Sequence, residues 1–157
     1  MATQKTNISI INKTKGKLPS LPFVTIKNDI LGEAYTLSIA YVSEKVSQGL
    51  NKKFRNKNNS TNILSFPLDK KNGEIILCPT LIKKEAKENT KGYDKNFTEW
   101  LGFLVIHGML HLKGMQHSDR MEREETKYDE KYRSRNRRRL HDDESRSGRV
   151  HKRREKS

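Results

Sequence analysis

One cysteine, Cys78, is all that this chain of 157 residues contains. It excludes a framework of internal disulfides and fits a reducing compartment. Apolar residues are also scarce, at 32%, and no stretch approaches the roughly 20 apolar residues that a membrane span needs. Residues 1–17 contain no apolar run followed by a cleavage site, so no signal peptide is apparent. These absences favour a cytoplasmic protein with no membrane partner.

Positive charge, in contrast, is abundant, and the net charge is +14. Residues 1–132 contain 22 Lys and Arg against 15 Asp and Glu, and residues 133–157 contain 11 against 4, so each part carries +7. The first part is rich in lysine and the second in arginine, with almost no apolar residue. We therefore predict one domain over 1–132 and a basic, disordered tail over 133–157. The tail is interpreted either as an arm that binds RNA phosphates or as an adventitious extension.

Hydrophobic periodicity and turn residues predict an α+β fold, a small mixed β-sheet covered by helices. Ser43 is predicted to cap one helix, and Asn96 to Glu99 has the spacing of a capping box that opens another. Residues 70–73 form a turn that can make the flanking strands a hairpin. The predicted strands span 7–11, 35–42, 63–67 (ended by Pro67) and 74–78, and the predicted helices span 20–31, 43–54, 81–89, 96–112 and 119–132.

Three of the five histidines, His107, His111 and His117, lie within eleven residues. On a helix His107 and His111 are four residues apart, so both imidazoles leave the same face. Gly114 favours the end of that helix because glycine tolerates the left-handed conformation, and the chain can then return His117 towards the other two. Three imidazoles that leave a fourth position for water are typical of a catalytic zinc site. The helix is otherwise apolar on all sides, which predicts that it is buried.

The same spacing occurs in the zinc-protease motif His-Glu-x-x-His-x-x-Gly-x-x-His. That motif has a glutamate after the first histidine as general base, whereas this chain has Gly108. The sequence therefore predicts the metal geometry of such proteases without their base.

The histidine segment resembles the signature His-Gly-x-Leu-His-x-x-Gly-x-Asp-His of the YbeY family, bacterial metal-dependent endoribonucleases of ribosomal RNA maturation. It departs at Gln116, where that family usually has aspartate. Further blocks resemble the family in order: Leu50 to Arg55, Thr61 to Pro67, Gly73 to Cys78, and Lys84 to Ala86. The resemblance covers residues 7–132.

The resemblance implies one zinc ion per chain on His107, His111 and His117, and it marks Arg55 and His107 as candidate catalytic residues. A guanidinium suits phosphate binding, although Arg55 can also act as a cation at a helix C-terminus. The implied function is zinc-dependent cleavage of single-stranded ribosomal RNA, including 16S rRNA 3′ end processing, and ribosome quality control, with the ribosome or its small subunit as partner. Lys52 and Lys53 are expected to help hold the RNA backbone, and Ser65 and Phe66 to line the cleft.

The sequence leaves two alternative functions open. One is a metal-dependent hydrolase of another substrate, such as peptides, and the other is a non-catalytic, ribosome-associated RNA-binding factor with structural zinc. The missing glutamate at Gly108 argues against the first, and a site with three ligands argues against the second. A carboxylate at position 116 could support a neighbouring ligand, so Gln116 is expected to weaken metal binding or turnover without abolishing it.

Overall fold

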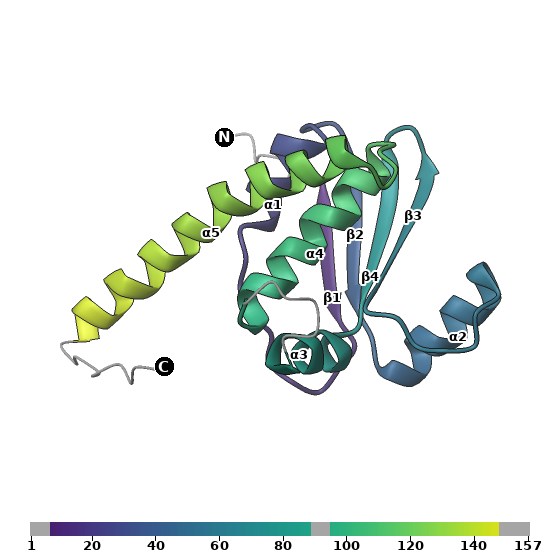
Figure 1. Cartoon of the computed structure of the whole chain (residues 1–157), viewed down its shortest axis with the longest axis horizontal. Helices are drawn as coiled ribbons and strands as arrows, with labels where there is room; N and C mark the ends of the chain where they lie inside the picture. The colour runs from purple at the N-terminus through teal and green to yellow at the C-terminus, as the bar shows by residue number, and fades with distance from the viewer. Residues whose placement is uncertain (1–6, 89–94, 148–157) are drawn as a thin grey trace, which may run out of the picture.

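The computed structural model describes the backbone of residues 7–88 and 95–147 and the side chains of residues 7–88 and 95–133. Within these ranges strands and helices combine into a single sheet with helices packed on it (Figure 1), which confirms the predicted α+β class. The strands are β1 (Ile8–Asn12), β2 (Thr36–Tyr41), β3 (Ile63–Asp69) and β4 (Asn72–Leu77), and the helices are α1 (Phe23–Ile30), α2 (Glu44–Arg55), α3 (Pro79–Glu88), α4 (Phe97–Leu112) and α5 (Asp119–Ser147).

The sheet is mixed, with strand order β1-β2-β4-β3. β1, β2 and β4 are parallel, whereas β3 and β4 pair antiparallel and form the predicted hairpin. The prediction that Pro67 ends β3 is wrong. The strand continues to Asp69, with a register shift after the proline. A proline is tolerated here because β3 is an edge strand, one side of which has no neighbouring strand.

The two faces of the sheet are covered unequally. α4 crosses one face, with α1, α3 and α5 packed around it, and α2 lies apart near the other side of β3 (Figure 1). The predicted alternation of β2 is confirmed, since Leu37, Ile39 and Tyr41 enter the main core with α4. The opposite face holds a smaller cluster of Val42, Leu64 and Ile76.

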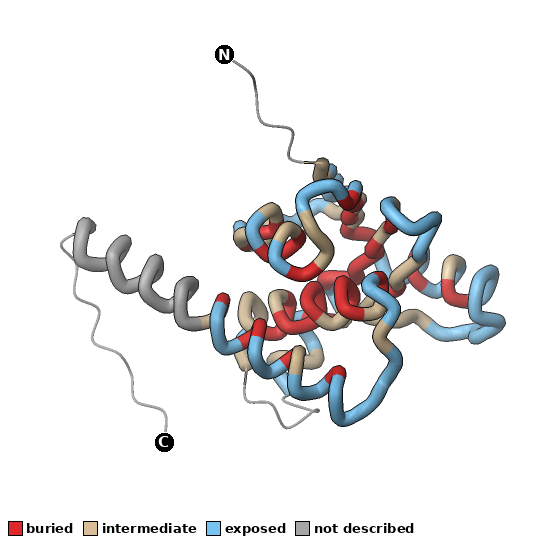
Figure 2. The backbone as a smooth tube through the Cα atoms, turned by 90° about the horizontal axis from the view of Figure 1, so that it is seen from above, coloured by how far each residue is buried: buried red, intermediate tan, exposed pale blue. Residues whose placement is uncertain are grey.

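α4 is the buried centre of the domain, as its apolar sequence predicts. Its start carries the predicted capping box: the Asn96 side chain accepts from the Glu99 N–H at 2.8 Å, and the Glu99 carboxylate accepts from the Asn96 N–H at 3.2 Å. Figure 2 shows buried backbone gathered in the middle of the body and exposed backbone along α2. Among the described helices, none combines the length and apolar character that a membrane crossing requires.

α5 extends further than predicted. Met121, Tyr128 and Tyr132 are buried, and Asp29 on α1 accepts hydrogen bonds from Lys131 and Tyr132, both at 2.6 Å. The sequence predicts a helix end near Tyr132 and a disordered tail from residue 133, yet the backbone is helical to Ser147. No proline or glycine interrupts the sequence before Gly148, so nothing local stops the helix. The rest of the predicted tail, residues 148–157, lies outside the described residues.

Candidate metal centre

The end of α4 determines how the three histidines meet. Lys113 is the last residue with helical dihedral angles, and Gly114 takes a positive φ of 105°. The Gly114 N–H donates to the His111 carbonyl at 2.9 Å, and the Met115 N–H donates to the Leu110 carbonyl at 3.0 Å. Bonds of this kind close a helix around a left-handed residue, a conformation that glycine adopts without strain. The predicted helix end is therefore confirmed, and the chain turns back towards α4.

This turn brings the three predicted imidazoles together. The ring centroids of His107 and His111 are 4.5 Å apart, and His117 lies 5.3 Å from His107 and 4.7 Å from His111. One nitrogen from each ring lies within 4.8 Å of the other two. His107 and His111 are half-buried, whereas His117 is exposed. The arrangement can hold one metal ion.

Two of these imidazoles are held by acceptors on their far side. Nδ1 of His107 contacts the Glu125 carboxylate, and Nδ1 of His111 contacts the Met115 carbonyl at 3.0 Å. Since both acceptors require an N–H, both Nδ1 atoms carry a proton, and in a neutral ring Nε2 is the nitrogen left to bind a metal. These Nε2 atoms lie 3.1 Å apart. This separation suits a cation bound by both nitrogens.

The charge state of His111 also favours metal binding. Burial lowers the pKa of His111, and the neighbouring His107 and His117 lower it further, against the Met115 carbonyl, which raises it. The ring is therefore neutral near pH 7 and its Nε2 lone pair is available. Zinc–nitrogen bonds of ordinary length in a tetrahedral site place two ligand nitrogens about 3.3 Å apart, close to the observed separation. The Nε2 atoms of His107 and His111 are therefore spaced as two ligands of one metal ion.

Gly108 explains why the glutamate of the protease motif has no counterpart here. A Cβ atom at position 108 would lie 2.9 Å from Ile63 Cδ1, 3.0 Å from Ser65 Oγ and 3.2 Å from Ile75 Cδ1. The Ser65 hydroxyl also donates to the Gly108 carbonyl at 3.4 Å. Position 108 therefore faces the sheet at close range and has no room for a general base.

Gly108→Ala should destabilise the protein by about 1–3 kcal/mol, because α4 must move away from β3 and β4 to admit the methyl group. Gly102→Ala on the same helix is the matched control: a Cβ there meets nothing within 4 Å, so it should be neutral or stabilising by up to about 1 kcal/mol. Urea denaturation of both variants measures the difference. Equal stabilisation by the two substitutions would show that α4 does not pack as closely on β3 as described.

A cleft of about 300 Å³ opens beside His107 and His117. Its walls include Asn62, just before β3, and Trp100 on α4. One carboxylate oxygen of Glu85 accepts from both the Asn62 amide and the Trp100 indole N–H, each at 2.9 Å. A side chain of α3 therefore fixes two walls of the cleft, which leaves a shaped, partly apolar space next to the imidazoles.

Other predicted site residues lie elsewhere. Arg55 is exposed at the last position of α2 and does not line the cleft. Ser65 and Phe66 are expected from the sequence to line it, but among the described residues Ile63 of β3 and the preceding Asn62 do so. Ser65 is covered by α4, whereas Phe66 packs on the opposite face of the sheet. Gln116 is exposed.

Glu125 is the site residue that sequence reasoning missed. It is only 7% exposed, and it supports His107 from α5, eight residues beyond His117. A signal was present in the sequence: the apolar stripe Met121, Tyr128, Tyr132 has helical spacing, and position 125 lies on it. A carboxylate in the middle of a buried stripe is seldom without a partner.

The fold and the cluster of three imidazoles, two of them held by acceptors, define an α+β domain with a candidate metal site whose ligand set is typical of catalytic centres. The sequence model of the family "Endoribonuclease YbeY" matches residues 3–135. The chain therefore belongs to the YbeY family of metal-dependent endoribonucleases, and a role in ribosomal RNA processing fits this family.

Individual relatives agree with this assignment. The chain is 31% identical over 135 residues to the Endoribonuclease YbeY of Francisella philomiragia, covering 76% of this chain and 83% of the relative. It is 34% identical over 136 residues to that of Francisella tularensis subsp. novicida, covering 75% and 80%. The solution structure of TM1509 from Thermotoga maritima superposes with a TM-score of 0.57 at 27% identity, covering 84% of this chain and 93% of that one.

Proposed function

We propose that this chain is a zinc-dependent endoribonuclease that cuts single-stranded regions of ribosomal RNA in the cytoplasm. Its role would be 16S rRNA 3′ end maturation and ribosome quality control, with the small ribosomal subunit as partner. The observation that carries the proposal is the pair of Nε2 atoms 3.1 Å apart, each made available by an acceptor on the other ring nitrogen. His107, His111 and His117 are the proposed ligands, with one zinc ion per chain.

The side chains around this site have different proposed roles. Glu125 and the Met115 carbonyl fix the orientation and tautomer of two imidazoles, and exposed His117 completes the set from the loop. When bound, zinc supplies Lewis acidity that polarises a phosphate oxygen or lowers the pKa of a water molecule. Glu85 holds Asn62 and Trp100 in the wall of the cleft, where they position the strand beside the imidazoles.

Arg55 is proposed to hold the RNA backbone from α2. The neighbouring Phe54 is 56% exposed and packs edge-to-face on Phe66 of β3, with ring centroids 5.1 Å apart. The Lys53 ammonium lies 5.3 Å from the Phe54 ring centroid. Exposed aromatic rings among basic side chains are typical of surfaces that bind single strands, because unpaired bases stack on the rings while cations contact phosphates. This combination supports a preference for unpaired RNA.

Arg55→Lys should keep the fold and the metal but lower RNA cleavage, since lysine retains the charge and loses the planar, bidentate fork. We expect a loss of about 10-fold, the scale of one good charge-assisted contact. Cleavage rates with a labelled single-stranded rRNA fragment test this, with exposed Lys45→Arg on the same helix as control. Unchanged cleavage by the Arg55→Lys enzyme would show that Arg55 does not hold the RNA and acts only as a positive charge at the C-terminus of α2.

The structure bears on both alternatives. A peptide hydrolase of the zinc-protease type needs a base beside the first histidine, and Gly108 faces the sheet with no space for one. A structural zinc usually has four protein ligands, and the cluster found among the described residues contains three. Incubating the metal-loaded protein with single-stranded RNA, duplex RNA and casein separates the three functions: the proposal requires cleavage of the first alone.

A further inference from the structure

A groove of about 550 Å³ lies on the outer side of α3, between that helix and the loop after β1. Its lining, called the α3 groove below, includes five lysines and one aromatic ring and no aspartate or glutamate: Lys15, Lys17, Lys83, Lys84, Lys87 and Phe97. The lysines come from two segments more than sixty residues apart in the sequence, and all five are exposed. The fold therefore assembles a basic surface that no single stretch of the sequence defines.

Among the described residues, no ion pair neutralises the lysines of this groove. In the part of the chain that the structure describes, the lysine ion pairs lie elsewhere, between Lys95 and Asp129 and between Lys131 and Asp29, for example. None of the five groove lysines forms one there. The first turn of α3 also contains no acidic residue, so the positive end of the helix dipole adds to the field. A polyanion in the groove would relieve this repulsion.

The α3 groove and the metal cleft share two helices. Glu85 of α3 points to the cleft, where it binds Asn62 and Trp100, while its neighbour Lys84 lines the groove. Phe97 begins α4, and His107 follows ten residues later on the same helix. A rise of 1.5 Å per residue separates them by about 15 Å along the axis. One strand of a few nucleotides can therefore contact both places.

We infer that the α3 groove is a second binding surface for the backbone of the RNA strand that is cut at the histidine cluster. This inference rests on the proposed function. Five cations without carboxylates match a row of phosphates, and salt-dependent contacts of this kind supply much of the affinity for nucleic acid. Phe97 adds an aromatic surface among the lysines, with the Lys83 ammonium 5.2 Å from its ring centroid. Cations and a ring in one groove suit a single strand.

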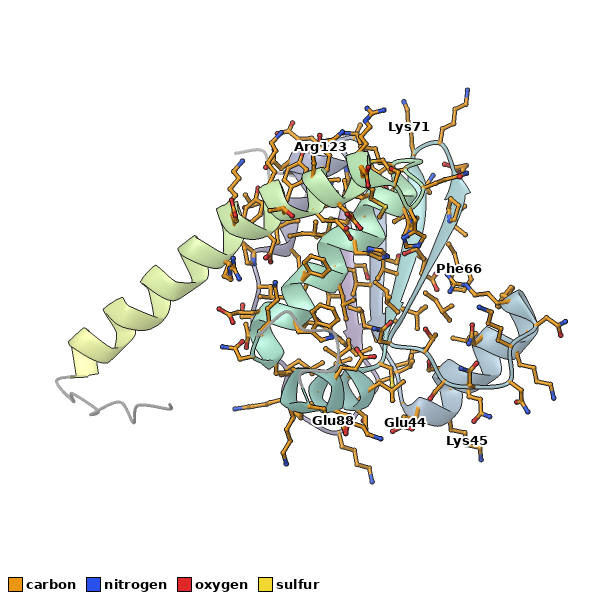
Figure 3. All side chains as sticks on the ribbon, viewed as in Figure 1. Glu44, Lys45, Phe66, Lys71, Glu88 and Arg123 are labelled. Atoms are coloured by element: carbon orange, nitrogen blue, oxygen red, sulfur yellow. The ribbon has the colours of Figure 1, made fainter. Side chains whose placement is uncertain are left out.

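The test neutralises each wall of the groove separately in the full chain. The two variants are Lys15→Gln/Lys17→Gln and Lys83→Gln/Lys87→Gln. The control Lys45→Gln/Lys71→Gln removes the same charge from two exposed lysines that extend into solvent at the start of α2 and at the β3–β4 turn (Figure 3). All are made in the His111→Ala background, so that the strand is not cut. Binding of a labelled single-stranded RNA is followed by fluorescence anisotropy at several salt concentrations.

Each groove variant should bind RNA more weakly and reduce the slope of log K against log salt by up to about 1.4, or about 0.7 for each phosphate that a lysine no longer neutralises. The control should keep the slope of the parent. Equal changes in all three variants would mean that only the overall charge matters, and unchanged binding would mean that RNA does not enter the groove; either result overturns the inference. Polyglutamate that competes as well as RNA would also overturn it, in favour of an acidic protein partner.

Cleavage by the wild-type protein separates this inference from the proposed function. If wild-type protein cuts single-stranded RNA while the groove variants bind like the parent, the groove inference fails and the function stands. If the wild type does not cut RNA but the groove variants lose affinity and slope, the function fails and the groove remains an RNA-binding surface.

Discussion

His111→Ala should remove nearly all bound zinc and lower RNA cleavage by more than about 100-fold, beyond the range typical of changes outside the ligand set. His111 presents one of the two Nε2 atoms that lie 3.1 Å apart, and its other ring nitrogen is already held by the Met115 carbonyl. Two remaining imidazoles hold zinc poorly. Because alanine favours helices, α4 should remain intact.

Elemental analysis of the purified protein measures this effect, with about one zinc per chain expected for the wild type. His141→Ala is the matched control, since it removes a histidine that is not among the three proposed ligands. Circular dichroism checks that helix content is unchanged in both variants. Full zinc occupancy in the His111→Ala protein would refute the assignment of this ligand.

Glu125→Gln should weaken zinc binding by about 10–100-fold, the range found for side chains that support a metal ligand. The Glu125 carboxylate contacts Nδ1 of His107 and is almost fully buried, so it both selects the tautomer and strengthens the imidazole as a donor. Glutamine can still accept the N–H through its carbonyl oxygen but carries no charge. Glu125→Ala, which removes the acceptor altogether, should lose more affinity than the glutamine variant.

Zinc affinity measured by competition with a chelator tests this, and the visible spectrum of the cobalt-substituted protein reports on ligand geometry. Glu122→Gln is the control, because Glu122 lines the same cleft one turn earlier on α5 and is exposed. Equal zinc affinities for the Glu125→Gln and Glu122→Gln proteins would show that Glu125 packs beside His107 without supporting it.

The features that could be predicted from the sequence are those encoded within a few residues. The four-residue spacing of His107 and His111, the capping box at Asn96 and the helix end at Gly114 all depend on local backbone geometry. The alternation in β2 is equally local. These signals are sufficient to predict the cluster of three histidines.

The features that could not be predicted depend on contacts between distant segments. Nothing near Pro67 shows that β3 is an edge strand, which is what allows the strand to continue. The partner of Glu125 lies on another helix, eighteen residues earlier in the sequence. The space around Gly108 is set by side chains of β3 and β4. From the sequence, position 116 is where a carboxylate that supports a histidine ligand would be expected. In the structure the supporting carboxylate is Glu125 of α5, which contacts His107 of α4.

The central claim is that this chain cuts single-stranded RNA with a metal held by His107, His111 and His117. The most direct measurement follows cleavage of an end-labelled, single-stranded rRNA fragment by the wild-type protein before chelation, after chelation and after zinc is added back. We expect cleavage that is lost on chelation and restored in proportion to the zinc bound, up to about one equivalent per chain. Cleavage that persists at full rate in protein shown to be free of metal would contradict it.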